Sequence, residues 1–351
     1  MQAMEEAIVR EISMKRGGWE KYGSAETIYF GGGTPSLLSA SSLGNIQNAL
    51  QKHWSTAREI TLEANPEDIT PEALDHWLQL GINRLSIGIQ SLHDPCLEWM
   101  NRKHSGEQAL TAVHQARNAG FQHLSVDLIY GVRSPTRRFD QELSVLLGLP
   151  VDHLSAYILT IEERTALGHR VRQGIEKTAP DELVEMEYAQ LCEAARRAGF
   201  NHYEVSNFAR PGGYAQHNQH YWSGKPYDGI GPGAHAFDGY ARSANVSHNL
   251  RYMQAVSKAS GPNDLTIERD PLTLRDRYNE TIMTGLRTQN GIVLQDLRNQ
   301  FGFDPQSLEP EIWNDLIQRG ELVENTPGTY RIPEALWLLA DRISSQLFAV
   351  E

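Results

Sequence analysis

Five short runs rich in β-branched, aliphatic and aromatic residues constrain the fold of this 351-residue chain most strongly. They start roughly 25 to 40 residues apart, as the strands of βαβ units do. Segments with apolar residues at helical spacing and a terminal Gly, such as 71–81 and 106–120, lie between them. We therefore expect an α/β fold with a parallel sheet. The runs are TIYFGGGTP (27–35), EITLEANPE (59–67), RLSIGIQS (84–91), HLSVDLIYG (123–131) and HLSAYILT (153–160).

Three consecutive glycines follow the first run and precede Thr34 and Pro35. Glycines let backbone N–H groups approach a ligand closely, although Gly-rich turns also serve as tight connections. Ligands of parallel sheets bind at the carboxyl ends of the strands, so polar residues near those ends should share one rim. This predicts a ligand site formed by Gly31, Gly32, Gly33, Glu63, Gln90 and Asp127.

The composition limits the class of protein. The length accommodates one large α/β domain and a smaller one. A formal net charge of −12 argues against nucleic acid as the main partner. The first residues, MQAMEEAIVREI, predict an acidic amphipathic helix rather than a signal peptide, and no apolar run approaches the ~20 residues of a membrane span. Two cysteines cannot form a disulfide framework, so we expect a cytoplasmic protein.

A series of motifs from residue 27 onward resembles the radical S-adenosylmethionine (radical SAM) proteins of the oxygen-independent coproporphyrinogen III oxidase group. The motifs are GGGTP, LEANPE, GINRLSIGIQSLHDPCLEWMNRKH, VDLIYGV and HLSAYILTIEERTALGH. A further segment, HNQHYWSGKPYDGIGPGAHAF (217–237), resembles the HemW branch of haem chaperones within this family through its HNxxYW and GxGxGAH motifs.

The resemblance implies a partial (β/α)6 radical SAM barrel, without its first strand here, and a C-terminal helical, winged-helix-like domain. Residues 1–242 would form the barrel core with the HNxxYW segment, 243–270 a polar connector containing a helix, and 271–351 the C-terminal domain. Within that last domain the sequence predicts three helices, a hairpin turning at Pro327-Gly328 and a closing helix. From 274 onward it holds seven Arg and no Lys against twelve Asp and Glu, so we do not expect it to bind DNA.

Residues that would bind S-adenosylmethionine follow from the same resemblance. It places the methionine part of the cofactor against the glycine loop, its carboxylate near a basic residue, its ribose against a carboxylate and its adenine against an aromatic residue and a turn. Arg102 in a surface ion pair and Asp127 as a helix cap are the alternatives. The implied set is Gly32, Gly33, Thr34, Glu63, Gln90, Arg102, Asp127, Tyr157, Ala234 and His235.

A haem site is the second implication. Neutral imidazole is a common axial ligand of haem iron, and His217 of the HNxxYW motif is the ligand that the resemblance implies. Tyr221 and Trp222 would supply flat apolar surface for the porphyrin. His220 is a second candidate and His235 a weaker one, and an ordinary structural histidine is the alternative for each.

The chain departs from the family in its cysteines. Radical SAM proteins hold a [4Fe–4S] cluster with a CxxxCxxC loop, which this sequence does not contain. Cys96 and Cys192 are far apart, and we expect both to be small, half-buried residues of helices. Either the start of the chain is assigned too far downstream, or the cluster ligands have been lost. We predict no radical catalysis from the chain as written.

These observations predict a haem chaperone that binds haem and delivers it to haem-dependent membrane or respiratory enzymes. The first alternative is an oxygen-independent coproporphyrinogen III oxidase or dehydrogenase of porphyrin biosynthesis. A cluster-free binding or regulatory protein is the third class. The oligomeric state stays open, with a homodimer among the options.

Overall fold

The computed structural model describes residues 2–15, 23–52, 54, 57–162, 165–265 and 267–350. The strands are β1 (Thr27–Phe30), β2 (Glu59–Ala64), β3 (Arg84–Gln90), β4 (His123–Tyr130), β5 (His153–Ile158), β6 (Asn201–Glu204), β7 (Asn207–Ala209), β8 (His235–Phe237), β9 (Ala241–Asn245), β10 (Ile267–Pro271), β11 (Ile292–Val293), β12 (Val323–Thr326) and β13 (Thr329–Arg331). The helices are α1 (Gln2–Lys15), α2 (Ala40–Gln51), α3 (Pro71–Gln79), α4 (Asp94–Trp99), α5 (Gly106–Ala119), α6 (Phe139–Gly148), α7 (Ala166–Arg172), α8 (Asp181–Arg197), α9 (Gln216–Trp222), α10 (Asn249–Lys258), α11 (Leu274–Leu286), α12 (Leu294–Phe301), α13 (Pro305–Leu308), α14 (Pro310–Gln318) and α15 (Ala340–Ser345).

The chain divides into two compact units. Unit 1 comprises Met1–Ile28, Leu38–Glu59 and Gln216–Glu351, and unit 2 comprises Tyr29–Leu37 and Ile60–Ala215. The strand-and-helix alternation predicted from the sequence belongs mainly to unit 2, whereas the HNxxYW segment belongs to unit 1.

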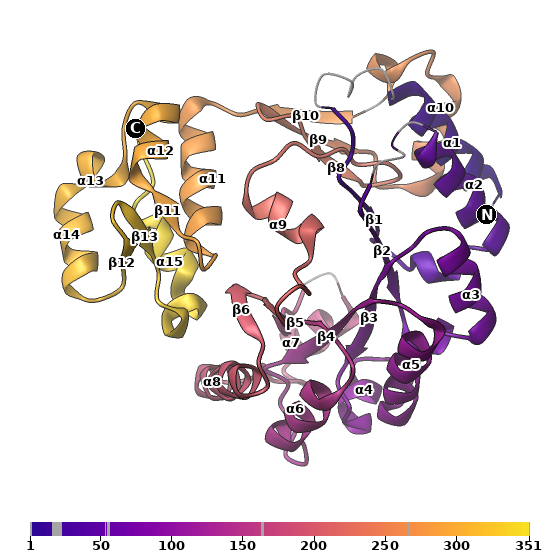
Figure 1. Cartoon of the computed structure of the whole chain (residues 1–351), viewed down its shortest axis with the longest axis horizontal. Helices are drawn as coiled ribbons and strands as arrows, with labels where there is room; N and C mark the ends of the chain where they lie inside the picture. Colours follow the sequence, from indigo (N-terminus) through magenta and orange to yellow (C-terminus); the bar gives the residue numbers. More distant parts are fainter. Residues whose placement is uncertain are drawn as a thin grey trace. The chain divides into compact units, whose positions relative to one another are not determined.

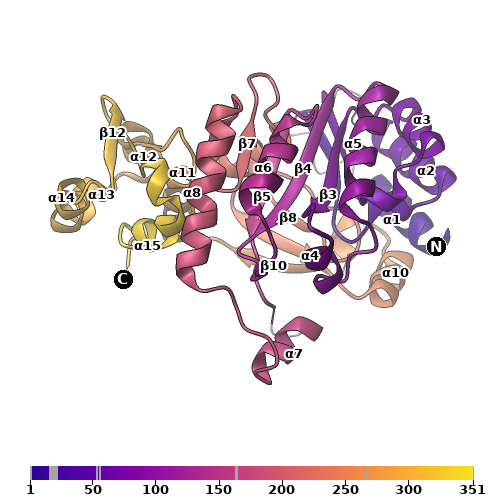
Figure 2. The same ribbon diagram turned by 90° about the horizontal axis from the view of Figure 1, so that it is seen from below.

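The main sheet has the strand order β1-β2-β3-β4-β5-β7-β6. Neighbours from β2 to β5 are parallel, as the βαβ period predicts, and β7 pairs antiparallel with both β5 and β6. The strands curl along an arc with α3, α5, α6 and α8 on its outer side (Figure 1), and the view from below shows α5, α6 and α8 running beside them (Figure 2). The predicted α/β fold with a partial barrel is confirmed.

Strict alternation along the strands gives the sheet one apolar and one polar face. Leu62, Leu85 and Leu124 share a row across β2, β3 and β4, and each is fully buried. The next row along the strands contains Glu63 and Ser86, which point to the opposite face because side chains alternate along a strand. The apolar face is the one that the helices cover, so polar side chains are left to line the inside of the curl.

Local signals fix the helices where the sequence predicts them. Ser105 forms a capping box with Gln108 at the start of α5, and Gly120 ends the same helix with φ 110°. Glycine adopts this left-handed conformation without the steric cost of a Cβ atom. The capping box and the terminal glycine account for the observed bounds of a helix expected at 106–120.

In unit 1, α1 packs against α10 around a small core that contains Ala7, Tyr252, Val256 and Leu265. Strands β8, β9 and β10 form a three-stranded antiparallel sheet. The stretch 243–270, expected as a polar connector with a helix, contains that helix as α10 but also strand residues of β9 and β10. The strands escaped prediction because their polar composition carries no apolar alternation.

The C-terminal residues form the helices and the hairpin expected from the sequence. Strands β12 and β13 flank Pro327-Gly328, and β11 adds a third strand to their sheet. Arg242 and Glu280 form an ion pair with 3.0 Å between Nη2 and Oε1, which ties β9 to α11. In the part of the chain that the structure describes, no helix is long and apolar enough to cross a membrane.

Candidate functional site

Glu63 organises the glycine loop at the rim of unit 2. Its carboxylate accepts hydrogen bonds from the Tyr29 hydroxyl at 2.8 Å and from the Gly32 backbone N–H at 3.2 Å. A Cβ atom at Gly31 would lie 2.5 Å from the Tyr29 ring and 3.0 Å from the Glu63 carboxylate, so a side chain does not fit there. Gly33 has φ 77°, a conformation that favours glycine. The loop is thereby held open and without side chains.

Asp127 lies within β4, three residues before its end, and not at a helix terminus. The Ser86 hydroxyl donates to its carboxylate at 3.1 Å, and Ser155 donates a second hydrogen bond. Burial, followed by the charge of Glu63, nevertheless raises the pKa of Asp127 to about 7. An incompletely compensated carboxylate of this kind is suited to accept hydrogen bonds from ligand hydroxyls.

The positive charge of Arg102 lowers the pKa of Asp127. It thereby opposes burial and the charge of Glu63, which raise that pKa. No ion pair or hydrogen bond joins its guanidinium to a residue that the structure describes. The surface ion pair considered for Arg102 is therefore absent among those residues. A half-buried guanidinium whose charge acts on the Asp127 carboxylate is well placed for a ligand carboxylate.

Backbone strain marks the end of β3. Gln90, the last residue of the strand, has φ 66°, and the pairing of β3 with β4 shifts register between Ile87 and Gln90. A positive φ is uncommon outside glycine and is retained where the surroundings hold it. The irregularity turns the Gln90 side chain toward Gly88, where a Cβ atom would lie 2.9 Å from its amide nitrogen.

Tyr157 lies on β5 with 45% of its surface exposed, and burial of its hydroxyl followed by the charge of Asp127 raises its pKa. Tyr29, Glu63, Asp127 and Tyr157 thus interact with one another. Thr34 follows the glycine loop in the same unit. Ala234 and His235 belong to unit 1, so their part in an adenine site stays a prediction.

The HNxxYW segment forms α9 in unit 1. The backbone N–H groups of Gln216 and His217 donate to the Glu59 carboxylate at 3.0 and 2.9 Å, which fixes the start of the helix. The His217 Nδ1 atom lies 2.8 Å from the Thr27 hydroxyl. Burial, followed by the charge of His220, lowers the pKa of His217 to about 4, so the imidazole is neutral at physiological pH.

One aromatic ring packs against this imidazole, and a second ring packs against the first. The ring of Tyr221 stands edge-on to His217 with 5.0 Å between ring centroids, and Tyr227 packs edge-on to Tyr221 at 4.5 Å. Trp222 lies under the Arg287 guanidinium at 5.8 Å. Tyr221 is 44% exposed, so part of this aromatic surface is open to a flat ligand.

A buried carboxylate holds the GxGxGAH loop from beneath. Glu11 of α1 is fully buried and accepts hydrogen bonds from Tyr252 at 2.6 Å, Asn245 at 2.7 Å and the Gly231 backbone N–H at 2.8 Å. Lys15 adds an ion pair at 2.8 Å. Four donors compensate the buried charge.

Lys15 extends this network to the start of the loop. Its ammonium group donates to the Gly229 carbonyl at 2.7 Å and to the Asp228 carboxylate at 3.2 Å. Burial disfavours its charged form, but the charges of Asp228 and Glu11 outweigh that effect and raise the pKa of Lys15. A Cβ atom at Gly229 would lie 2.1 Å from the His235 carbonyl oxygen, so only glycine fits at this position.

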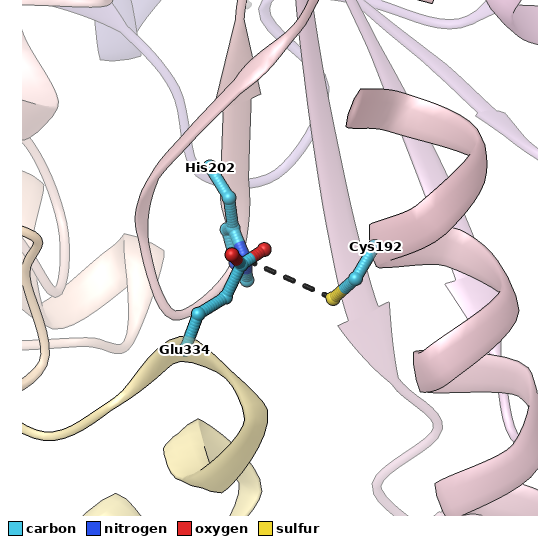
Figure 3. A group of neighbouring side chains, drawn as sticks. All are labelled: Cys192, His202 and Glu334. Atoms are coloured by element: carbon cyan, nitrogen blue, oxygen red, sulfur yellow. Dashed lines mark hydrogen bonds between the residues drawn. The ribbon is translucent and has the colours of Figure 1, made fainter. Parts of the chain in front are cut away.

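The two cysteines do not provide a cluster site. Both cysteines were expected to be half-buried. Cys192 is half-buried, whereas Cys96 is 1% exposed and therefore more buried than expected. Figure 3 shows the Cys192 sulfur facing His202, with 3.8 Å between Sγ and Nδ1. Glu334, the third side chain in that view, belongs to the other compact unit. Two separate thiols do not fit the three or four thiolates of a [4Fe–4S] cluster.

Sequence reasoning missed several residues of these networks. Tyr29, Ser86 and Ser155 are polar residues at alternate positions of strands, a period-2 pattern that marks the inner face of the sheet. The pattern was visible in the sequence as RLSIGIQ and HLSAYILT. Glu11 gave no such signal, because it is an ordinary acidic residue of an amphipathic helix until its partners, more than 200 residues away, are known.

Comparison with known proteins shows the family of this chain. The family model of the Radical SAM superfamily matches residues 5–146. The heme chaperone HemW of Bacillus subtilis is 30% identical over 322 residues, which cover 91% of this chain and 84% of the relative. HemW of Mycobacterium tuberculosis is 37% identical over 280 residues, covering 78% of this chain and 70% of the relative. The chain belongs to the HemW family.

A solved structure supports the fold of the whole chain. The coproporphyrinogen III oxidase HemN of Escherichia coli, a radical SAM enzyme, superposes with a TM-score of 0.82 over 99% of this chain and 82% of its own. The two sequences are 19% identical, so this likeness concerns the fold. Membership of the HemW family therefore comes from the sequence relatives, and the HemN structure confirms the architecture.

Proposed function

We propose that this chain binds haem and hands it to haem-requiring proteins. The observation that carries the proposal is His217, a half-buried imidazole kept neutral by its surroundings and placed beside the exposed ring of Tyr221. Only the neutral imidazole has a lone pair for iron. The Thr27 hydroxyl engages Nδ1 and thereby orients the imidazole ring. The relatives named as heme chaperones support the same reading.

The surroundings of α9 are consistent with a haem that is bound and then released to another protein. Among its described residues none is fully buried, and the helix has only two turns. A haem held by one imidazole on a short, open helix can be released more readily than one sealed in a core. We expect the acceptors to be haem-dependent membrane or respiratory enzymes, the chaperone to work in the cytoplasm, and a homodimer to be one of its states.

S-adenosylmethionine is the second ligand that we propose. The glycine loop offers backbone groups without side chains, Asp127 offers acceptors to the ribose hydroxyls, and Arg102 offers a guanidinium to the methionine carboxylate. Glu63 fixes the loop, and Tyr157 interacts with Tyr29, Glu63 and Asp127. When bound, this cofactor supplies a sulfonium and an adenosyl group. The cysteines of this sequence do not fit a [4Fe–4S] cluster, so we derive no radical step.

A visible-absorption titration with ferric haem tests the haem proposal. Wild type should show a saturable Soret shift, His217→Ala should lose it, and His220→Ala should retain most of it. His114→Ala is the matched control, because His114 is an exposed histidine of α5. An unchanged titration of His217→Ala would contradict His217 as the ligand, and no binding by wild type would reject the chaperone function.

A further inference from the structure

A cavity of about 720 Å³ lies in unit 1 between α10 and the three-stranded sheet. Its size falls within the range of about 300 to 1,000 Å³ that is usual for small-molecule sites. Two of its lining residues have been described above, Asn245 in the Glu11 network and His235 in the turn that the resemblance places at the adenine. The cavity is a separate feature from α9, whose residues do not contribute to its lining.

Helix α10 presents two different faces because of its residue spacing. Tyr252 and Val256 are buried in the core that α10 shares with α1. Arg251, Ala255 and Lys258 recur at the helical spacing of three or four residues and line the cavity instead. The helix thus directs two cationic side chains and a small apolar one toward the cavity.

The two cationic side chains that α10 directs toward the cavity are available to a ligand. Arg251 and Lys258 are exposed, and neither makes an ion pair with a residue that the structure describes. The one carboxylate in the lining, Glu268, lies on β10 across the cavity. Two cationic side chains on one side therefore outnumber the acid on the other, which favours a ligand with at least two anionic groups.

Part of the remaining lining is aliphatic, beside the polar residues Ser247, His248 and Gln254. Ala244, Val246 and Ile267 contribute aliphatic surface from the sheet side, and the imidazole of His235 stands in the same lining. The register pairs His235 with Ala244, so the imidazole and the small residue are neighbours across β8 and β9. A small residue beside an imidazole leaves room for a ring to lie against the sheet.

The floor of the cavity is rigid. Asn245, which contributes to the lining, donates its side-chain amide both to the buried Glu11 carboxylate at 2.7 Å and to the Gly231 carbonyl at 2.8 Å. The backbone N–H of Gly233, another lining residue, is bonded to the Val246 carbonyl at 3.2 Å. A preformed wall loses little conformational entropy when a ligand binds.

We propose that this cavity is a second subsite for porphyrin, in which Arg251 and Lys258 neutralise the two propionates and the ring lies against the sheet. The inference rests on the proposed haem function but needs no iron ligand. It differs from the α9 site in this respect, because His217 recognises the metal whereas the cavity recognises the carboxylates and the ring.

Fluorescence anisotropy with metal-free protoporphyrin IX tests the subsite in the full chain. The Arg251→Ala/Lys258→Ala double variant should bind this porphyrin about tenfold or more weakly, since two charge-assisted contacts are lost. The Arg196→Ala/Arg197→Ala variant removes the same charge from the exposed face of α8 and should bind like wild type. His217→Ala should also bind the metal-free porphyrin normally.

The outcomes separate the two proposals. Equal protoporphyrin affinity in wild type and the cavity variant overturns the subsite, while a Soret shift that depends on His217 leaves the haem function intact. Protoporphyrin binding that depends on Arg251 and Lys258, with a haem titration that is unchanged in His217→Ala, rejects the His217 site and keeps the subsite. Displacement of the porphyrin by micromolar ATP, with the same dependence on the two cations, would assign the cavity to nucleotides and overturn the porphyrin proposal.

Discussion

Glu11 in unit 1 and Asp127 in unit 2 are both carboxylates that folding removes from water, but their surroundings differ. Glu11 receives hydrogen bonds from four donors, one of them a lysine. Asp127 receives two hydroxyl hydrogen bonds, lies close to the charge of Glu63 and has its pKa raised to about 7. A buried charge that is fully paired holds a structure together, whereas one left partly unpaired is available to a ligand.

Removing the compensated carboxylate should have the largest effect. Glu11→Ala leaves Lys15 buried beside Asp228 and three further donors without an acceptor, so we expect a loss of about 3 to 5 kcal/mol in the free energy of unfolding. Urea unfolding followed by circular dichroism measures it. Glu6→Ala on the exposed face of α1 is the control and should change stability by less than about 0.5 kcal/mol. A similar small change for Glu11→Ala would refute the structural role.

Removing the uncompensated carboxylate should affect binding rather than folding. Asp127→Asn keeps the shape but weakens acceptance from ribose hydroxyls, so we expect at least about tenfold weaker S-adenosylmethionine binding by calorimetry. Asp140→Asn, at an exposed position of α6, should bind like wild type. Lower thermal stability of Asp127→Asn together with unchanged affinity would reverse the contrast between the two carboxylates.

The pH dependence of stability should also distinguish Asp127 from Glu11. Asp127 has a folded pKa of about 7 against an ordinary value of 3.8, so between these values the folded state binds the proton that the unfolded state releases. Its contribution to stability therefore falls as the pH rises from about 4 to about 7. Thermal unfolding should show Asp127→Asn gaining stability relative to wild type between pH 5 and pH 8. A difference that is constant over this range would contradict the raised pKa.

The smallest effect is expected for Glu5, which lies on the same helix as Glu11 but nearer the surface. Its carboxylate accepts hydrogen bonds from Ser42 and Asn45, both at 2.6 Å, and these bonds lower its pKa from 4.5. Glu5→Gln should lower the melting temperature by about 1 °C at pH 7. Because the pKa is lowered, this contribution should vanish as the pH falls below about 4.5. A loss of stability as large as that of Glu11→Ala would show that the difference in burial does not decide how much each residue contributes to stability.

Much of unit 2 could be predicted because its signals are local. The apolar runs, the cap at Ser105 and the left-handed Gly120 each act within a few residues, and together they predict the parallel strands and the helices. The antiparallel strands β6 and β7 were missed because they are four and three residues long. Strands β9 and β10 were missed because they are polar and gain their structure from pairing.

For the candidate site, the sequence indicated which residues lie on or near the strands but not the contacts that these residues make. Gln90 is the last residue of β3 and Glu63 the next to last of β2, whereas Asp127 lies inside β4. That Glu63 holds the Gly32 N–H, or that Thr27 faces Nδ1 of His217, depends on residues 31 and 190 positions apart. No periodicity in the sequence encodes such a contact.

By itself, the sequence determined the order of strands and helices, the glycine loop, the HNxxYW histidine and the family, since these depend on neighbouring residues or on motifs. Only the tertiary structure decided which carboxylate is paired and which is not. Three of the four partners of Glu11 come from residues 220 to 241 positions further along the chain, and the charge beside Asp127 comes from a different strand. The electrostatic environment of a side chain is a sum over neighbours in space, so it is fixed only when the chain has folded.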